Sequence, residues 1–464
     1  MIKVLRKSEM LNNLIGEQNR ESDTLYKNSV FNYIVQNDDG ILVFNTLMNV
    51  LIFTDKENRA YFTDKPFRTP HNEDIDFLIN NRLLVPQETD ETKLYLEFHD
   101  LMRTIEDAKQ GIERYNILTT TNCNARCFYC YEEGIRQESM SPETALDVAR
   151  YIAQTRAKSG RTYLRWYGGE PLVNSKVIDT ISSAMVENDI PFYSTISTNG
   201  YLIDDETIEK ATGLWNVKKI RIPMDGMEAE HNRRKNFKNN KDDAFRKTMD
   251  NIQRVVDSGI TMTVRLNIDA DNIDSITELA HYLTEKYEGN PEFNMYVRCL
   301  FSEISIEKHR TNRAYVEKLL GKKKEIEAYL RMHRIFDWQK LAPIGFRTYC
   351  CAANNPNMVT VVPNGNLCSC ECHCFDDAHW GNIYQGIIDR DEYDAWIKNE
   401  MQEKCAGCVF LPECTPFIAQ CPMSDWDCKT KFSAVMEDYM DENYKRFRSG
   451  SKLLEDEVFS VYDY

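Results

Sequence analysis

The sequence predicts an α/β protein built around a partial, TIM-like (β/α)6 barrel, with a winged-helix-like domain before it and a loop-rich domain after it. Strand and helix patterns alternate between residues 112 and 300. Short strands with tight turns precede them, and cysteine, glycine and proline become frequent from residue 346. Six strand–helix units imply a parallel sheet that curls without closing, because a closed barrel of this kind needs more units.

The first 105 residues predict a small separate domain. The segment FNYIVQNDDGILVFNTLMNVLIFTD suggests three short strands, with one turn at Asp39-Gly40 and another near Met48-Asn49. Apolar residues with roughly helical spacing follow Asn72. This combination fits a winged-helix-like module, and the alternative is an extension that only packs on the main body.

Six strands are expected in the central domain, each followed by a helix or a loop. The strand segments are RYNILTTTN, TYLRWYGGEP, FYSTISTNG, VKKIRIPMDG, TMTVRLNID and FNMYVRCLF. The sequence Ser141-Pro142-Glu143 predicts the start of a helix that ends near Gly160. The other helices are expected over residues 177–187, 205–212, 243–258 and 273–287.

The remaining sequence divides by composition. Residues 301–345 are charged and mostly helical and look like a bridge. From residue 346 the sequence looks like a loop-rich region folded around metal, and the tail of residues 430–464 looks helical and then acidic. The expected domains are therefore 1–105, 112–300, 301–345, 346–440 and 441–464.

The composition excludes several classes of partner. The chain has 464 residues, 57 basic and 73 acidic side chains, and a formal net charge of −16. Nucleic acids and anionic membranes favour basic surfaces, so neither is expected as a partner. The sequence has no run of about 18 apolar residues and no signal-peptide core. We therefore expect a cytoplasmic protein.

Fifteen cysteines are present, and fourteen of them are clustered. Three lie in TTTNCNARCFYCYEEG, eleven lie between residues 350 and 428, and Cys299 is alone and is expected to be a buried strand residue. In an intracellular chain of this size, clustered cysteines bind metal more often than they form disulfides.

The first cluster consists of Cys123, Cys127 and Cys130, directly after the first barrel strand. Barrel enzymes place their chemistry at this end of the strands. A four-iron, four-sulfur cluster normally takes four thiolates, so three would leave one iron open to a small molecule. The alternative is a zinc site completed by a distant residue, although the CxxxCxxC spacing differs from the paired CxxC knuckles typical of zinc.

This motif, with Tyr129 before its last cysteine, resembles the signature of radical S-adenosylmethionine (radical SAM) enzymes. The resemblance implies that S-adenosylmethionine chelates the open iron and is cleaved to a 5′-deoxyadenosyl radical. The motifs YGGEP, STNG and MDG follow the next three strands in the family's order, and HNRRK also resembles a family segment. The family usually has Ser at the position before the DG pair where this chain has Pro223, and this residue departs from the pattern. The implied cosubstrate contacts are Tyr129, Gly168, Gly169, Glu170, Pro171, Ser197, Asn199, Asp225 and Arg265.

The later cysteines resemble the SPASM domain that follows radical SAM barrels in peptide-modifying enzymes and carries two auxiliary iron–sulfur clusters. If the ligand positions of that domain apply to this chain, the first auxiliary cluster would be held by Cys350, Cys351, Cys370 and Cys421, and the second by Cys405, Cys408, Cys414 and Cys428. The total would be three four-iron clusters. The crowding of Cys368, Cys372 and Cys374 around Cys370 departs from the family pattern, and so do the six residues between Cys414 and Cys421. Zinc at Cys405 and Cys408 is the rival interpretation.

Two further resemblances suggest a function. Glu371 stands where sulfatase-maturing relatives have an acidic general base, and a solvated glutamate is the alternative. GILVFNTLMNVLIF resembles the strand region of the peptide-recognition element of ribosomal peptide (RiPP) maturases, which adds a leader peptide at a sheet edge.

The leading hypothesis is an oxidoreductase that crosslinks a ribosomally made precursor peptide, with a cysteine thioether favoured. Its partners would be the precursor and a reducing protein such as flavodoxin or ferredoxin. The alternatives are a formylglycine-forming sulfatase maturase, a peptide epimerase and a zinc-stapled interaction protein.

Overall fold

The fold was analysed in a computed structural model of the whole chain. It describes residues 2–8, 11, 15, 23–36, 38–63, 65–108, 111–158, 160–238, 243–300, 313–337, 346, 348–349, 351–374, 378–397, 401, 403–414 and 428–453. The chain forms two compact units. The first gathers residues 1–108, 338–354 and 398–464, and the second gathers 109–337 and 355–397.

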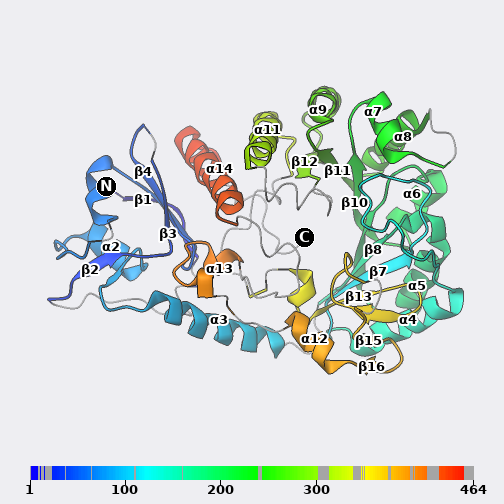
Figure 1. Cartoon of the computed structure of the whole chain (residues 1–464), viewed down its shortest axis with the longest axis horizontal. Helices are drawn as coiled ribbons and strands as arrows, with labels where there is room; N and C mark the ends of the chain where they lie inside the picture. Colours follow the sequence, from blue (N-terminus) through cyan, green and yellow to red (C-terminus); the bar gives the residue numbers. More distant parts are fainter. Residues whose placement is uncertain are drawn as a thin grey trace. The chain divides into compact units, whose positions relative to one another are not determined.

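A four-stranded antiparallel sheet organises the first unit (Figure 1). Its strand order is β1-β5-β4-β3, so β3 lies at one edge. The strands are β1 (Ile2–Arg6), β3 (Asn32–Gln36), β4 (Ile41–Asn45) and β5 (Val50–Thr54). The three strands and two turns expected from residue 31 to residue 55 are confirmed. Gly40 is needed at the first turn, because a side chain there would meet the carbonyl oxygen of Thr54.

Helices and a second, two-stranded sheet complete this unit. The helix expected after Asn72 is present, and the Asn72 side chain accepts the N–H of Ile75 as its cap. The other elements were not anticipated in the sequence, apart from the C-terminal helix. The bounds are α2 (Glu73–Asn80), α3 (Glu91–Asp107), α13 (Leu411–Cys414), α14 (Cys428–Ser449), β2 (Tyr26–Asn28) and β6 (Leu84–Pro86).

The core of the first unit joins its distant segments. Apolar residues of the sheet and of α2 and α3 pack with Cys405 and Leu411 in one cluster. The hydroxyl of Thr46 donates to the carbonyl of Val409 at 2.6 Å, and Arg6 donates to the hydroxyl of Tyr439 at 2.8 Å. Residues 403–414 and α14 therefore stabilise the N-terminal sheet.

The second unit contains a sheet whose first six strands are parallel. They lie in the order β12-β11-β10-β9-β8-β7, as consecutive strand–helix units predict. Their bounds are β7 (Arg114–Thr120), β8 (Thr162–Gly168), β9 (Phe192–Ser197), β10 (Val217–Met224), β11 (Thr261–Ile268) and β12 (Phe293–Cys299). All six expected strands are confirmed, and Cys299 is buried at the end of the last one.

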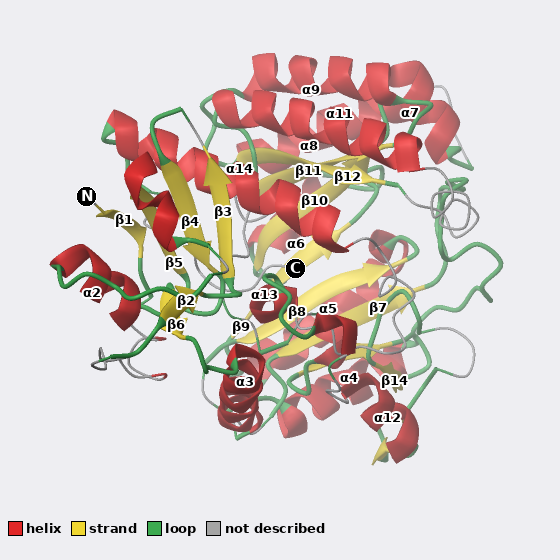
Figure 2. Cartoon of the chain, turned by 60° about the vertical axis from the view of Figure 1, so that its left-hand side comes forward, coloured by secondary structure: helices red, strands yellow, loops and turns green. Residues whose placement is uncertain are grey.

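Helices cover one face of this sheet (Figure 2), α4 and α5 along β7 and β8, and α8 and α9 along β10 to β12. The five expected helices are present. Ser141 caps α4 by accepting the N–H of Thr144. The bounds are α4 (Pro142–Thr155), α5 (Ser175–Glu187), α6 (Asp205–Thr212), α7 (Glu228–Lys235), α8 (Ala244–Asp257), α9 (Ile273–Tyr287) and α11 (Arg313–Met332).

The sheet continues beyond β7 with strands from the cysteine-rich region. β13 (Met358–Val361) pairs parallel with β7, and β14 (Asn366–Cys368), β15 (Gly381–Asn382) and β16 (Gly386–Ile387) follow antiparallel. Within the described residues the sheet has two free ends, β12 and β16. The fold is thus an open α/β sheet, as the partial barrel predicted.

Helix α11 lies in the expected bridge, and α14 agrees with the expected helical C-terminal segment. Residues 301–312, 338–345 and 454–464, which include the rest of the bridge and the acidic tail, lie outside the described residues. No helix in the described parts is long and apolar enough to cross a bilayer.

Candidate active site

The loop that follows β7 brings together the three cysteines of the first cluster. Cys123, Cys127 and Cys130 are partly buried free thiols. The N–H of Cys130 donates to the carbonyl of Cys127 at 3.1 Å, which forms a turn between the last two. The loop therefore lies at the carboxyl end of the parallel strands, where the sequence predicted it.

The segment after α7 holds this loop in place. The N–H of Arg126 donates to the carbonyl of Lys235 at 2.9 Å, and the N–H of Lys238 donates to the carbonyl of Asn124 at 2.8 Å. The thiol of Cys127 lies 3.9 Å from the same Lys235 carbonyl. Two backbone bonds thus fix the loop on either side of Ala125.

A buried network of polar side chains anchors the cysteine loop to the neighbouring strand ends. The hydroxyl of Tyr129 contacts both carboxylate oxygens of Asp225, at 2.8 and 2.7 Å. The Nζ of Lys235 donates to this hydroxyl at 2.8 Å and lies 3.2 Å from Asp225 Oδ2. Asn267 donates to Asp225 Oδ1 at 2.8 Å, and the Asn272 amide donates to the Asp225 carbonyl at 2.9 Å. This network ties the cysteine loop to the ends of β10 and β11.

The charges in this network balance one another. The side chains of Lys235 and Asp225 are 2% and 0% exposed. Burial alone would raise the pKa of Asp225, but the nearby Lys235 and the hydrogen bonds from Tyr129 and Asn267 bring it below its ordinary value. Burial and the nearby Lys235 lower the pKa of His231 to about 3, so this imidazole is neutral.

The glycines of YGGEP allow the next strand end to approach the cysteine loop. A side chain on Gly168 would meet the carbonyl oxygen of Thr120 at 2.2 Å, and one on Gly169 would meet that of Asn122 at 2.6 Å. Gly168 also has φ of +124°. The N–H of Glu170 donates to the Asn122 carbonyl at 2.9 Å. The close approach in this structure is therefore between two backbone segments, directly before Cys123.

Glu170 is completely buried and organises the loop after β9. Its carboxylate accepts the hydroxyl of Thr198 at 2.6 Å and the N–H of Asn199 at 2.7 Å. It also accepts the N–H of Leu172, which follows the buried Pro171. Burial raises the pKa of Glu170 to about 7, although these bonds oppose the shift. Asn199 in turn donates to the Asn124 side chain at 2.6 Å and lies 3.9 Å from the Cys123 thiol.

The other expected cosubstrate contacts lie on neighbouring strands. Ser197 is the last residue of β9, and Arg265 lies on β11 opposite Pro223 and Tyr296. The Nε atom of Arg265 is buried and has no hydrogen-bond partner among the described residues. An anionic group could therefore satisfy this guanidinium.

The chemistry of the donors fits a cationic cluster at the three cysteines. Burial raises the pKa of Cys123 to about 12 and that of Cys130 to about 11, and it also raises the pKa of Cys127. Without a cation these thiols stay protonated, and a bound metal is what deprotonates such ligands. Among the described residues, no three His, Cys, Asp or Glu side chains converge as the ligands of a single metal ion.

Glu371, the expected general base, lies in an ion pair. Its carboxylate accepts from Arg165 of β8 at 2.7 Å and from the Asn116 amide at 3.4 Å. The side chains of Arg165 and Glu371 are 14% and 18% exposed, so the pair is largely buried. The alternative of a solvated glutamate is wrong, while the catalytic role stays a prediction.

Cysteines expected at the auxiliary clusters are distributed over both units. In the first unit, the N–H of Cys408 donates to the carbonyl of Cys405 at 3.1 Å, so a turn brings these two residues together beside the core. Cys414 ends α13, and Cys351 is exposed. Cys428 begins α14, and Cys350 and Cys421 lie outside the described residues. Cys370 lies in the second unit with Cys368, Cys372 and Cys374.

The sequence did not reveal the residues that hold the cysteine loop. Lys235 lies within HNRRK, which was noted only for its resemblance, and Asn267 and Asn272 were not singled out. A lysine between polar residues is normally solvent-exposed, so only the tertiary structure shows that Lys235 is buried.

Comparison with known proteins decides the family. Residues 117–283 match the model of the radical SAM superfamily. The chain contains a radical SAM domain. It is therefore an enzyme that uses S-adenosylmethionine and a four-iron, four-sulfur cluster.

Curated relatives of this radical SAM enzyme are distant. A probable GTP 3′,8-cyclase from Archaeoglobus fulgidus is 24% identical over 297 residues, which cover 60% of this chain and 93% of the relative. An AdoMet-dependent heme synthase from Nitratidesulfovibrio vulgaris is 27% identical over 180 residues, covering 38% and 46%. The second alignment therefore spans less than half the length of that relative.

Solved structures share the fold at low identity. Native anSMEcpe with bound AdoMet has a TM-score of 0.55 at 14% identity, covering 72% of this radical SAM chain and 98% of the other. The same protein with AdoMet and a bound peptide also gives 0.55, at 16% identity.

Proposed function

We propose that this radical SAM enzyme is a peptide maturase that installs an oxidative crosslink, favoured as a cysteine thioether, in a ribosomally made precursor. The observation that carries the proposal is that one chain contains both the anchored cysteine loop and, in its other unit, a sheet that ends at strand β3 among the described residues. A fold neighbour solved with a bound peptide supports a peptide substrate. The precursor and a reducing protein such as flavodoxin or ferredoxin would be its partners, in the cytoplasm.

Cys123, Cys127 and Cys130 would hold the catalytic cluster in this proposal. When bound, the cluster and S-adenosylmethionine supply a 5′-deoxyadenosyl radical that abstracts hydrogen from an unactivated carbon. The network of Tyr129, Asp225 and Lys235 would hold the cysteine loop in a single conformation. The three thiols would then be in position to bind the cluster without rearrangement.

The strand ends around this loop would bind the cosubstrate. The partly buried guanidinium of Arg265 suits its carboxylate, since the buried Nε atom has no partner among the described residues. Ser197 ends β9, Asn199 follows it and Asp225 follows β10, so all three lie at the carboxyl edge of the sheet and can present polar atoms to the cosubstrate. Gly168, Gly169, Glu170 and Pro171 bring the second strand end against the cysteine loop.

The reaction would remove two hydrogens from the peptide for each crosslink. One leaves as an atom with the 5′-deoxyadenosyl group, and the other leaves as a proton and an electron when sulfur bonds to carbon. Glu371 would take the proton, and Arg165 of β8, 2.7 Å from its carboxylate, would hold that carboxylate in position. Cys350, Cys351, Cys370 and Cys421 would hold one auxiliary cluster, and Cys405, Cys408, Cys414 and Cys428 would hold a second. When bound, these clusters would supply an acceptor for the electron.

Strand β3 is the proposed site for the leader peptide. It is an edge strand, and edge strands accept an extra strand through their outward N–H and C=O groups. The N–H of Thr46 donates to the carbonyl of Phe31, so by antiparallel alternation the N–H of Ile34 points away from β4. Ile34 is thus one of the residues that would pair with the leader.

The edge can be tested with one substitution. Ile34→Pro removes an outward donor without removing a bond to β4, and proline is tolerated at such edge positions. We expect weaker binding of the full precursor, measured by fluorescence anisotropy, with unchanged formation of 5′-deoxyadenosine. Ile34→Val keeps the donor and is the control. Equal precursor affinity for the proline variant would remove β3 from the proposal.

The activity itself is tested by anaerobic co-expression with a cysteine-containing peptide encoded beside the gene. A crosslink lowers the peptide mass by about two units, whereas epimerisation leaves it unchanged. Iodoacetamide then separates a thioether, whose cysteine no longer reacts, from a carbon–carbon or carbon–oxygen link. Formylglycine in the product would instead support a sulfatase maturase, and zinc without sulfide would support an interaction protein.

Cyclisation of GTP is the second candidate, because the curated relative from Archaeoglobus fulgidus aligns over 93% of its length. That alignment covers only 60% of this chain, so it leaves much of the chain without a counterpart. Incubation of the reduced enzyme with GTP and S-adenosylmethionine, followed by chromatography of the nucleotides, tests this candidate. Unchanged GTP favours the peptide substrate.

A further inference from the structure

The loop after β14 carries four cysteines at alternate positions, Cys368, Cys370, Cys372 and Cys374. Only Cys370 matches the SPASM pattern, so three are surplus to it. The structure separates the four into two pairs with different surroundings.

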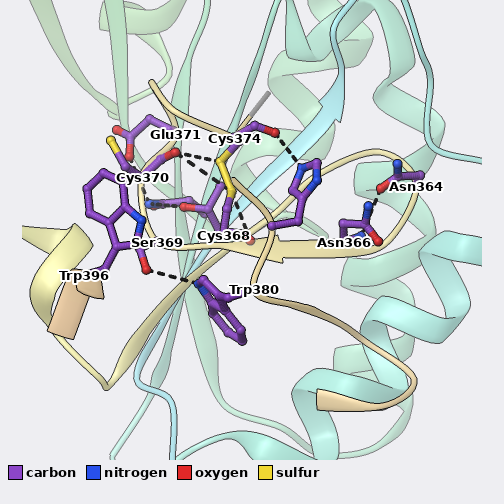
Figure 3. The surroundings of a disulfide bond; sticks show 12 residues. Asn364, Asn366, Cys368, Ser369, Cys370, Glu371, Cys374, Trp380 and Trp396 are labelled. Carbon is purple, nitrogen blue, oxygen red and sulfur yellow. Dashed lines mark hydrogen bonds between the residues drawn. A yellow bond between two sulfur atoms is a disulfide. The ribbon is translucent and has the colours of Figure 1, made fainter. Parts of the chain in front are cut away.

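Cys368 and Cys374 form a buried pair. They are 0% and 1% exposed, are joined by a disulfide, and pack against Leu118 and Val362. The Cys374 sulfur lies 2.7 Å from the carbonyl oxygen of Cys370 (Figure 3). These two sulfurs face each other and the apolar core, which leaves them unsuited to bind a further group.

Cys370 and Cys372 form the other pair. Both are free cysteines, one partly buried and one exposed. Figure 3 shows the Cys370 side chain pointing away from the disulfide. The N–H of His373 donates to the Cys370 carbonyl at 3.1 Å, and this turn lets the Cys370 and Cys372 thiols interact directly.

Cationic side chains flank this pair. The charges of Arg165 and Arg298 both act on Cys372, and Arg165 is also paired with the Glu371 carboxylate. Tyr131, which follows the last cysteine of the radical SAM loop, is also close enough to interact with Cys372. Thiolate-bound iron clusters are anionic overall, so an arginine-flanked thiol pair is a suitable place for one.

We propose that Cys370 and Cys372 together ligate the first auxiliary iron–sulfur cluster and that Cys368 and Cys374 do not. The inference rests on the proposed function, which assigns an auxiliary cluster to this region. It adds Cys372 as a ligand that the family pattern does not include. The pair supplies two of the four thiolates that such a cluster normally takes, so Cys372 replaces one of the three cysteines outside this loop that the family pattern assigns to it.

Iron and sulfide analysis of the full chain tests the assignment. After anaerobic reconstitution, Cys370→Ala and Cys372→Ala should each contain about four fewer irons and sulfides per chain than the wild type. The double variant Cys368→Ala/Cys374→Ala should keep the wild-type content. A Cys372→Ala variant with full iron and sulfide content would overturn the proposal, as would iron loss in the double variant with an unchanged circular dichroism spectrum.

Thiol labelling gives the same answer without any substitution. In the iron-loaded chain, iodoacetamide should leave Cys370 and Cys372 unmodified, and after removal of iron it should modify both. Cys368 and Cys374 should react only after reduction and unfolding. Modification of Cys372 in the iron-loaded chain, or zinc at this loop without sulfide, would contradict the proposal. Neither measurement uses the peptide product, so a failed peptide assay leaves this result intact.

Discussion

The two cysteine loops of the second unit are held in different ways. The loop of residues 123–130 has three free thiols and is fixed by backbone bonds to residues 235–238 and by a buried network of charged groups. The loop of residues 368–374 has four cysteines, and two of them form a disulfide in the core. A buried ion pair therefore stabilises the first loop, whereas apolar packing and a covalent bond stabilise the second. Because different interactions stabilise the two loops, we expect a substitution in one loop to leave the structure of the other unchanged.

The largest expected effect comes from removing the ligands of the first loop. Cys123→Ala, Cys127→Ala and Cys130→Ala in one chain should abolish cleavage of S-adenosylmethionine and lower the iron content by about four per chain. Iron bound elsewhere should persist. The measurement is chromatography of 5′-deoxyadenosine together with iron analysis, and Cys299→Ala is the control, since this buried cysteine lies outside both loops. Undiminished 5′-deoxyadenosine in the triple variant would refute the ligand assignment.

The next effect concerns the ion pair beneath the first loop. Lys235→Met leaves the Asp225 carboxylate buried without its cation and should lower the free energy of unfolding by about 3–5 kcal/mol. Arg233→Met is the matched control on the same helix, and because Arg233 is 63% exposed it should cost about 0–1 kcal/mol.

The double variant Lys235→Met/Asp225→Asn sharpens this test. Removing both charges should restore much of the stability that the single substitution loses, because no unpaired charge remains. Urea denaturation of the three variants measures the effect. If Lys235→Met and Arg233→Met cost the same, the ion pair does not stabilise the first loop.

Stability should also depend on pH through Glu170. Its pKa is raised from 4.5 to about 7 in the folded chain. The stabilisation from its bound proton is therefore complete below pH 4.5 and is lost as the pH rises to about 7, a change of roughly 3 kcal/mol. The stability difference between the wild type and Glu170→Gln should fall over this interval in urea denaturation. A constant difference would show that Glu170 does not titrate there.

The smallest effects compare single hydrogen bonds in the two loops. Tyr129→Phe removes bonds to charged groups and should cost about 1.5–3 kcal/mol, while Ser369→Ala removes the neutral bond from the Trp380 indole and should cost about 0.5–1.5 kcal/mol. Thermal unfolding of both variants measures the difference. A larger loss of stability for Ser369→Ala than for Tyr129→Phe would show that the bonds to charged groups do not stabilise the first loop more than a neutral bond stabilises the second.

The sequence predicted the parallel sheet and the position of the first loop well, because six strand–helix units and the Cys123–Cys130 spacing are local patterns. It did not predict that β13 extends the sheet beside β7, since this pairing joins residues far apart in the chain. Nor did it predict that residues 403–414 and α14 pack on the N-terminal sheet. Burial of Lys235 and the pairing of Cys368 with Cys374 likewise depend on tertiary contacts. A spacing pattern alone does not determine them.

Mass spectrometry of the co-expressed precursor is the decisive test of the proposed peptide crosslinking. We expect a peptide about two mass units lighter per crosslink, with the joined cysteine unreactive toward iodoacetamide, and a precursor of unmodified mass when the triple cysteine variant replaces the wild type. A precursor of unchanged mass, from a wild-type enzyme that cleaves S-adenosylmethionine in its presence, would contradict it.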